Sequence, residues 1–233
     1  MLFIQKSINP PADWDKWIVY TNGNGATIRM DDYEAQYDKW QTLPKKKLRE
    51  YLLNEQNYKC AYCEQKITNE KSSIEHLIPK SVNKPLSTVY HNLVMVCLGN
   101  DGLSGGKHCD KSRGDKAIIP LVFYDSILPK VDRGGKIEKH SQFFEAQSTG
   151  EFKVKKNSSP VISETWKILN ITDHPKLNVA REGVIKGITK VMARYKDNTE
   201  QTKYLRNTLE TYQREKGIEF RTFVMVWLSQ KIQ

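Results

Sequence analysis

The 233-residue sequence predicts an α+β fold built around a small metal-stabilised centre, and three observations lead to this prediction. All four cysteines of the chain fall within one 50-residue window. Two short apolar runs of strand length follow the first cysteine pair, and apolar residues recur at helical spacing from Trp166 onward. We therefore expect the centre to be flanked by an N-terminal helical arm and a C-terminal helical region.

Composition and charge narrow the class of protein. The longest apolar runs, 117–124 and 93–97, are too short to cross a bilayer, and the opening MLFIQKSINPP does not read as an export signal. We expect a soluble, cytoplasmic protein without membrane contacts. The net charge of +10 is uneven: residues 45–116 and 166–233 carry +5 and +6, whereas residues 1–44 carry −2. Such a surface favours a polyanionic partner such as nucleic acid.

The cysteines are Cys60 and Cys63 in a C-A-Y-C turn, then Cys97 and Cys109, separated by eleven residues that include four glycines. Two disulfides would have three possible connectivities, but nothing in the sequence indicates an oxidising compartment. The pattern predicts one structural Zn²⁺ held by all four thiolates. His108 is an alternative ligand.

Around the cysteines the pattern predicts a helix, two strands and a short helix. Leu48, Tyr51 and Leu52 recur at helical spacing after Pro44, which suits a first turn. A first strand is expected around residues 74–78, closed by a proline, and a second over 93–97. A short helix follows Cys109, with Asp110 near its start as a cap.

The second half of the chain is expected to be irregular at first and then helical. Residues 143–154 read as a hairpin around Thr149-Gly150. Three apolar stripes then predict helices. The stripes are Leu177, Ala180, Val184, Ile188, Val191 and Tyr195; Tyr204, Leu205, Leu209 and Tyr212; and Phe220, Phe223, Val224, Trp227 and Leu228.

One composite motif spans the cysteine window. It consists of Glu75-His76 with Pro79, Asn92-Leu93 at the second strand, and Cys109-Asp110 with Arg113-Gly114. This combination resembles the HNH endonucleases, which implies a ββα-metal nuclease core with structural zinc. The same resemblance implies hydrolysis of phosphodiester bonds in nucleic acid, with DNA favoured over RNA.

The residue types suit that chemistry. The ordinary pKa of a histidine, ~6.5, suits His76 as the general base for an attacking water. Glu75 and Asp110 offer hard oxygens to a catalytic Mg²⁺ or Mn²⁺. We expect Lys111 and Arg113 to hold flanking phosphates, and Asn92 to orient the loop and His76.

Each assignment has a plainer alternative. His76 and Glu75 could be ordinary strand residues, with Glu75 facing solvent. Asp110 could be a helix cap, a metal ligand or both, and Asn92 a simple turn residue.

The resemblance extends to one HNH subgroup, the PtuB-type nucleases of Septu and retron-associated antiphage systems. The stretches that carry it are IQKSINPP, WKILNI (166–171) and HPKLNVAREGV (174–184). It implies an ABC-type ATPase partner and action on nucleic acid during infection. The acidic N-terminal segment contains three tryptophans, Trp14, Trp17 and Trp40. They would suit a docking arm for this partner, and they would equally suit the hydrophobic core.

Four regions are therefore expected. They are an N-terminal helical, partner-docking segment (1–57), the nuclease core with zinc (58–120), an irregular and hairpin segment (121–165) and a basic helical region (166–233). Two other functions remain open: a non-catalytic zinc module that binds nucleic acid or protein, and a stand-alone restriction or homing nuclease. The Glu75-His76 pair with Asp110 favours an enzyme, because a pure binding module needs no base beside two carboxylates.

Overall fold

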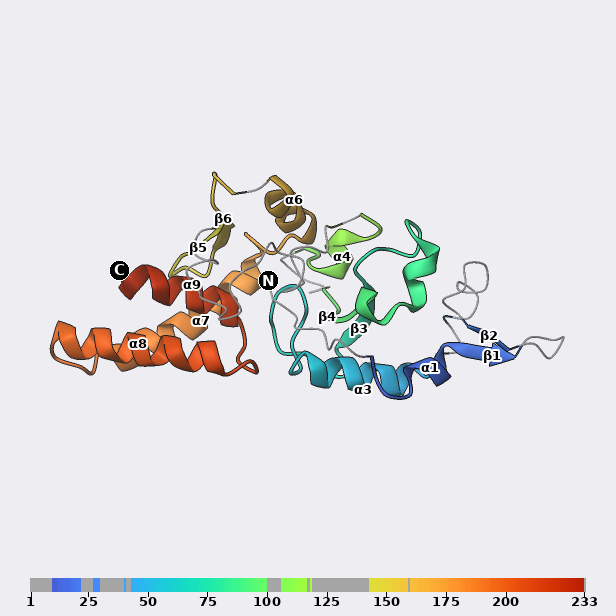
Figure 1. Cartoon of the computed structure of the whole chain (residues 1–233). Coiled ribbons are helices and arrows are strands. Elements are labelled where there is room, and N and C mark those ends of the chain that lie inside the picture. The colour runs from blue at the N-terminus through green and yellow to red at the C-terminus, as the bar shows by residue number, and fades with distance from the viewer. Residues whose placement is uncertain are drawn as a thin grey trace.

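The structure of the protein is a computed structural model that describes residues 10–21, 27–29, 40, 43–99, 106–116, 118, 143–158 and 160–232. It confirms an α+β fold of helices and two-stranded sheets. The elements follow one long axis, with β1 and β2 at one end, α7, α8 and α9 at the other, and β3, β4 and α4 between them (Figure 1).

The N-terminal part contributes α1 (Trp14–Trp17), the antiparallel strands β1 (Val19–Thr21) and β2 (Thr27–Arg29), and α3 (Lys45–Glu55). Trp14 and Trp40 are buried, so the core interpretation holds for both. Trp14 packs edge-on against Tyr90, at 5.6 Å between ring centroids. Trp14 and Trp40 therefore belong to the core.

The central part has the predicted order of helix, two strands and short helix, but the first strand begins and ends about two residues earlier than expected. It contains β3 (Ser72–His76), the 3₁₀ turns η2 (Lys84–Thr88) and η3 (Tyr90–Asn92), β4 (Leu93–Cys97) and α4 (Asp110–Arg113). Strands β3 and β4 pair antiparallel, with His76 opposite Leu93 and Ser72 opposite Cys97. Every residue of β4 is buried, so this strand runs through the core.

Gln56, the residue after α3, fixes that helix against β4. Its side chain donates to the Met95 carbonyl at 2.8 Å and accepts from the Met95 amide at 2.7 Å. The Ala61 amide donates to the same carbonyl at 3.0 Å. The cysteine turn that follows α3 is thereby held beside the end of β4.

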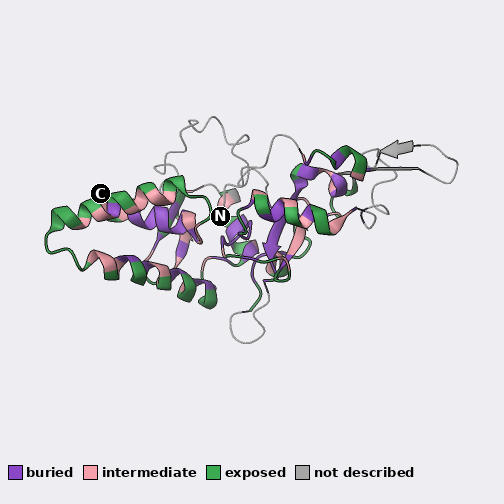
Figure 2. Cartoon of the chain, turned by 90° about the horizontal axis from the view of Figure 1, so that it is seen from below, coloured by how far each residue is buried: buried purple, intermediate pink, exposed green. Residues whose placement is uncertain are grey.

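The C-terminal part consists of β5 (Phe144–Ala146), β6 (Phe152–Val154), α6 (Pro160–Leu169), α7 (Pro175–Met192), α8 (Asn198–Arg214) and α9 (Arg221–Ile232). Strands β5 and β6 form the predicted hairpin. Helix α9 is buried along most of its length, from Thr222 to Leu228. Figure 2 shows the buried residues gathered in the central strands and on the inward faces of the helices.

The predicted stripe on α7 is only partly confirmed. Leu177 and Ile188 are buried and Val184 packs against the core, but the other buried positions are Arg181 and Ile185, and Ala180 and Tyr195 are exposed. The physical reason is Arg181, whose guanidinium lies 5.7 Å from the ring centroids of both Phe152 and Phe223. A buried arginine cannot be read from an apolar pattern.

No helix within the described ranges has the length and apolar character that a bilayer crossing requires.

Candidate functional site

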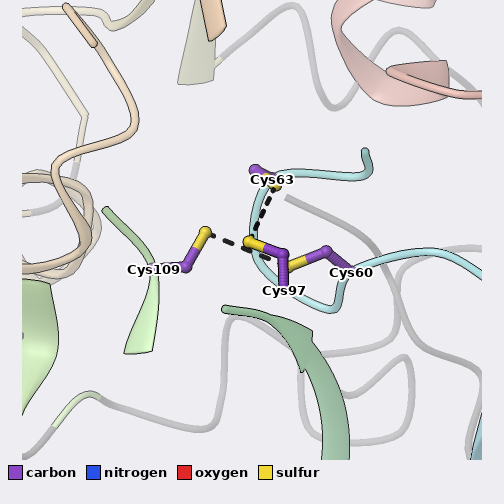
Figure 3. A group of neighbouring side chains, drawn as sticks. All are labelled: Cys60, Cys63, Cys97 and Cys109. Carbon is purple, nitrogen blue, oxygen red and sulfur yellow. Dashed lines mark hydrogen bonds between the residues drawn. The ribbon is translucent and has the colours of Figure 1, made fainter. Parts of the chain in front are cut away.

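The four cysteines form a buried cluster (Figure 3). Their sulfur atoms all lie within 4.8 Å of one another, and Cys60–Cys109 and Cys63–Cys97 are each 3.9 Å apart. Those distances are far longer than a disulfide bond, ~2.05 Å. They are close to the edge of a tetrahedron with Zn–S bonds of ~2.3 Å, which is about 3.8 Å. The arrangement is that of a tetrahedral metal site with four thiolate ligands.

The two ends of the glycine-rich connection between Cys97 and Cys109 are joined by a hydrogen bond. The His108 amide donates to the Gly99 carbonyl at 3.0 Å. Gly99 has φ +57°, and a Cβ there would lie 2.0 Å from the His108 carbonyl oxygen. Only glycine fits at this point, and the closure brings Cys109 back beside Cys97.

The surroundings of the cluster fit a metal. Burial, followed by the neighbouring Cys60, raises the pKa of the Cys109 thiol, so without a cation this thiol resists ionisation. Arg181 is buried nearby; burial lowers its pKa to about 10, and the acidic groups of Cys63, Glu64 and Cys109 oppose that shift. A zinc ion with four thiolates carries a net charge of −2, which a buried guanidinium complements. The four cysteines can therefore hold a metal such as zinc.

His108 also lies at the cluster. Its Nδ1 is 3.1 Å from the Cys109 sulfur and 3.8 Å from the Cys97 sulfur. A ring N–H at that position can donate to a thiolate sulfur. With four thiolates in place, this is the role that the geometry favours for His108 over that of a ligand.

A second feature is a cavity of about 410 Å³ that brings three of the predicted site residues together. It is lined by Glu75, His76, Pro79, Lys80, Ser81, Lys84, Asp110, Gly114 and Asp115. Glu75 and His76 come from the end of β3, and Asp110 from the start of α4. Three of the positions singled out in the sequence thus meet in one polar pocket.

Arg113 is not placed as predicted. Its side chain is buried and forms a salt bridge with Glu75, and it donates to the Tyr62 hydroxyl at 2.9 Å. It also donates to the carbonyls of His76 and Leu77, each at 2.7 Å. A guanidinium used in this way has no face left for a phosphate, so the phosphate-binding prediction for Arg113 is wrong. Its role is to anchor α4 to the end of β3.

Glu75 and Asp110 form a carboxylate pair. Burial raises the pKa of Glu75 to about 8; Arg113 opposes that rise, and the Asp110 carboxyl beside it adds to it. Arg113 and Tyr62 both contact Oε1 of Glu75, and the Asp110 side chain forms a hydrogen bond with the same carboxyl group. Two adjacent carboxylates suit a divalent cation, because its charge would offset the repulsion between them.

A backbone carbonyl orients the ring of His76. Its Nε2 lies 2.9 Å from the Ser87 carbonyl oxygen, which can only accept, so Nε2 carries the proton. In the neutral ring Nδ1 then presents a lone pair. Burial is the main cause that lowers the pKa of His76, to about 4, so the ring is neutral at pH 7. Trp40 packs edge-on against the ring at 4.6 Å.

Asn92 is buried, and its side chain orders the loop after β3. Its Oδ1 accepts from the Ile78 amide at 2.8 Å, and its Nδ2 donates to the carbonyls of Ile78 and Leu86, both at 3.0 Å. This matches the expected loop-orienting role. It does not fit a catalytic contact with substrate, because these bonds occupy the amide.

Two smaller predictions about α4 need correction. Cys109, not Asp110, is the residue before the helix, and no side-chain hydrogen bond caps α4. Lys111 is exposed but does not line the cavity. The lysines that do line it, Lys80 and Lys84, were not singled out in the sequence, although Lys80 directly follows the proline of the motif.

A scan against protein-family models finds no match for this chain, and a search of curated proteins finds no significant relative. Arguments about function therefore start from the geometry of the two sites.

Proposed function

We propose that the protein is a metal-dependent endonuclease of the HNH type, which hydrolyses phosphodiester bonds in nucleic acid, with DNA favoured. The observation that carries this proposal is the pocket that joins Glu75, His76 and Asp110. The order of β3, β4 and α4 supports it, because this is the order of a ββα-metal core.

His76 is the proposed general base. With the proton fixed on Nε2 by the Ser87 carbonyl, Nδ1 can accept a proton from a water in the cavity. Burial keeps the ring neutral at pH 7, so Nδ1 is unprotonated, but the lowered pKa of about 4 makes it a weaker base than an ordinary histidine. Asn92 acts one step away, since it orders the loop that leads to Ser87.

Glu75 and Asp110 are the proposed ligands of a catalytic Mg²⁺ or Mn²⁺. Such an ion supplies charge that binds the scissile phosphate and stabilises the leaving oxygen. Arg113 holds Glu75 in place through the buried salt bridge. In this proposal the four-cysteine cluster is a separate structural zinc site. Because Cys109 is one of its ligands, the cluster holds the backbone next to Asp110 in place.

The test is cleavage of supercoiled plasmid DNA, and of total RNA in parallel, by zinc-loaded protein with Mg²⁺ or Mn²⁺. We expect nicking that falls by ~10²–10⁴-fold in His76→Ala, the range for loss of a positioned base. The exposed His91→Ala is the matched control and should cut at the parental rate. Parental cleavage by folded His76→Ala protein would contradict the mechanism.

A role in antiphage defence with an ABC-type ATPase partner is a further proposal, and it rests on the sequence resemblance alone. Because Trp14 and Trp40 belong to the core, a deletion of residues 1–44 would disturb folding as well as docking. Co-purification of the full chain with the ATPase is the appropriate test, and failure of the two proteins to associate would contradict it.

A further inference from the structure

The cavity has a basic wall that the mechanism above does not use. Lys80 and Lys84 line it, and Lys45, the first residue of α3, lies close to Lys80. Both Lys45 and Lys80 are half-buried and project over the ring of Trp40. Their ammonium nitrogens are 4.0 and 5.5 Å from its centroid. Segments far apart in sequence thus bring two cations to one aromatic ring.

This gathering of like charge is unfavourable by itself. Within the part of the chain that the structure describes, no salt bridge joins Lys45 or Lys80 to a carboxylate. Burial lowers the pKa of Lys45, and repulsion from Lys80 lowers it further. Cation–π contact offsets only part of that cost, ~0.5–2 kcal/mol for each lysine. Two such cations beside a reactive pocket suit a bound anion.

The position of the pair indicates which anion. Trp40 contacts His76 edge-on at 4.6 Å, so the lysines lie on the side of the histidine that faces Trp40. The carboxylates of Glu75 and Asp110, where the scissile phosphate would bind, neighbour Arg113 instead. A phosphate held by Lys45 and Lys80 is therefore a different phosphate from the one that is cut.

We propose that Lys45 and Lys80, held on Trp40, form a subsite for a phosphate that flanks the scissile one. This inference rests on the proposed function and adds to it a preference between substrates. The enzyme selects a polynucleotide strand over an isolated phosphodiester, because only a strand supplies a second phosphate at the required place. The subsite takes the flanking-phosphate role that the sequence analysis had assigned to Lys111 and Arg113, but from a different side of His76.

The experiment compares two substrates in the full chain. Lys45→Gln, Lys80→Gln and the double variant are tested against Lys155→Gln, an exposed lysine outside the cavity that removes the same charge. Lys80→Arg keeps the charge. One substrate is a labelled DNA oligonucleotide, cleaved with Mn²⁺ and bound with Ca²⁺ over a range of salt. The other is bis(p-nitrophenyl) phosphate, a diester without a flanking phosphate. Zinc content and thermal unfolding confirm that each variant is folded.

We expect the double variant to lose about 10–100-fold in kcat/KM on DNA, which corresponds to one or two charge-assisted contacts. Hydrolysis of bis(p-nitrophenyl) phosphate should stay within about twofold, and the salt dependence of DNA binding should fall by about one unit of slope. Lys80→Arg should retain most of the DNA activity, and Lys155→Gln should match the parent.

Two results would overturn the subsite. If the double variant binds and cuts DNA as Lys155→Gln does, the lysines only cover Trp40. If it loses activity equally on both substrates, the lysines act on the scissile phosphate or on His76. A parent protein that cleaves neither substrate refutes the proposed function instead. In that case the binding measurement with Ca²⁺ still decides whether the lysines hold a phosphate.

Discussion

Glu64, the residue directly after the second cysteine, accepts hydrogen bonds from Thr222 at the start of α9. Its Oε2 is 2.7 Å from the Thr222 amide nitrogen, and its Oε1 accepts from the Thr222 hydroxyl. On the other side of the cysteine turn, the buried Lys59 donates to the carbonyls of Lys216 and Ile218. Two buried charged side chains thereby tie the metal-binding turn to the connection between α8 and α9.

We predict that Glu64→Ala destabilises the protein by about 1–3 kcal/mol, because it leaves the buried amide and hydroxyl of Thr222 without an acceptor. Chemical denaturation measures the free energy of unfolding. The same substitution at Glu210, which is exposed on α8, should change it by less than ~0.5 kcal/mol. Equal effects in the two variants would argue against this coupling.

Removal of the metal should unfold the centre of the molecule. Protein prepared without chelator is expected to contain about one zinc per chain, measured by elemental analysis. Cys60→Ser should lose most of that zinc and melt at a lower temperature, as should the parent protein after chelator treatment. A parental melting temperature in zinc-free protein would show that the cluster is not a structural metal site.

Arg113→Gln is predicted to affect stability, not phosphate contact. It breaks a buried ion pair and leaves the Glu75 carboxylate, which is largely buried, without its cation; losses of this kind cost ~3–5 kcal/mol. Lys111→Gln removes one positive charge from the exposed neighbouring position and should unfold like the parent. The comparison uses denaturant unfolding together with DNA affinity measured on folded protein. Weakened DNA binding in a fully stable Arg113→Gln protein would restore the original assignment.

Asp110→Asn should shift the metal requirement of cleavage. Loss of one of two paired carboxylates weakens the cation site, so more Mg²⁺ or Mn²⁺ is needed and part of the rate returns at high concentration. Asp115 lines the same cavity but is not among the groups that shift the pKa of Glu75. Asp115→Asn should therefore leave the metal dependence nearly unchanged. A larger shift in Asp115→Asn would move the ligand assignment to that residue.

The sequence was sufficient to predict the elements around the cysteines. The second strand matches β4 in both of its bounds, and the hairpin at Thr149-Gly150 is confirmed. Apolar runs, turn residues and cysteine spacings are local, so they can be read without the rest of the fold. The N-terminal stretch IQKSINPP lies almost entirely outside the described residues, as do residues 119–142 of the segment predicted to be irregular.

The errors concern charged side chains whose partners lie far away in sequence. Arg113 was assigned to a flanking phosphate because it is a basic residue at the short helix, yet it pairs with Glu75, which lies 38 residues earlier. Arg181 shifted the buried face of α7 for the same reason. Lys45 and Lys80 were missed because the ring that gathers them, Trp40, is adjacent to neither in sequence. Such contacts depend on tertiary structure.

The Cys109 amide donates to the carbonyl of Leu169 at 2.8 Å, the Ser112 hydroxyl donates to the carbonyl of Ile168, and the Asn170 side chain donates to the carbonyl of Lys107. The fourth cysteine is therefore held by a segment that begins some fifty residues beyond it. A fragment that stops at residue 120 would keep every motif of the proposed nuclease and lose the backbone that orients its last ligand. The region of the proposed nuclease motif therefore does not form a self-contained unit. Chimeras or shortened proteins derived from this chain should retain α6.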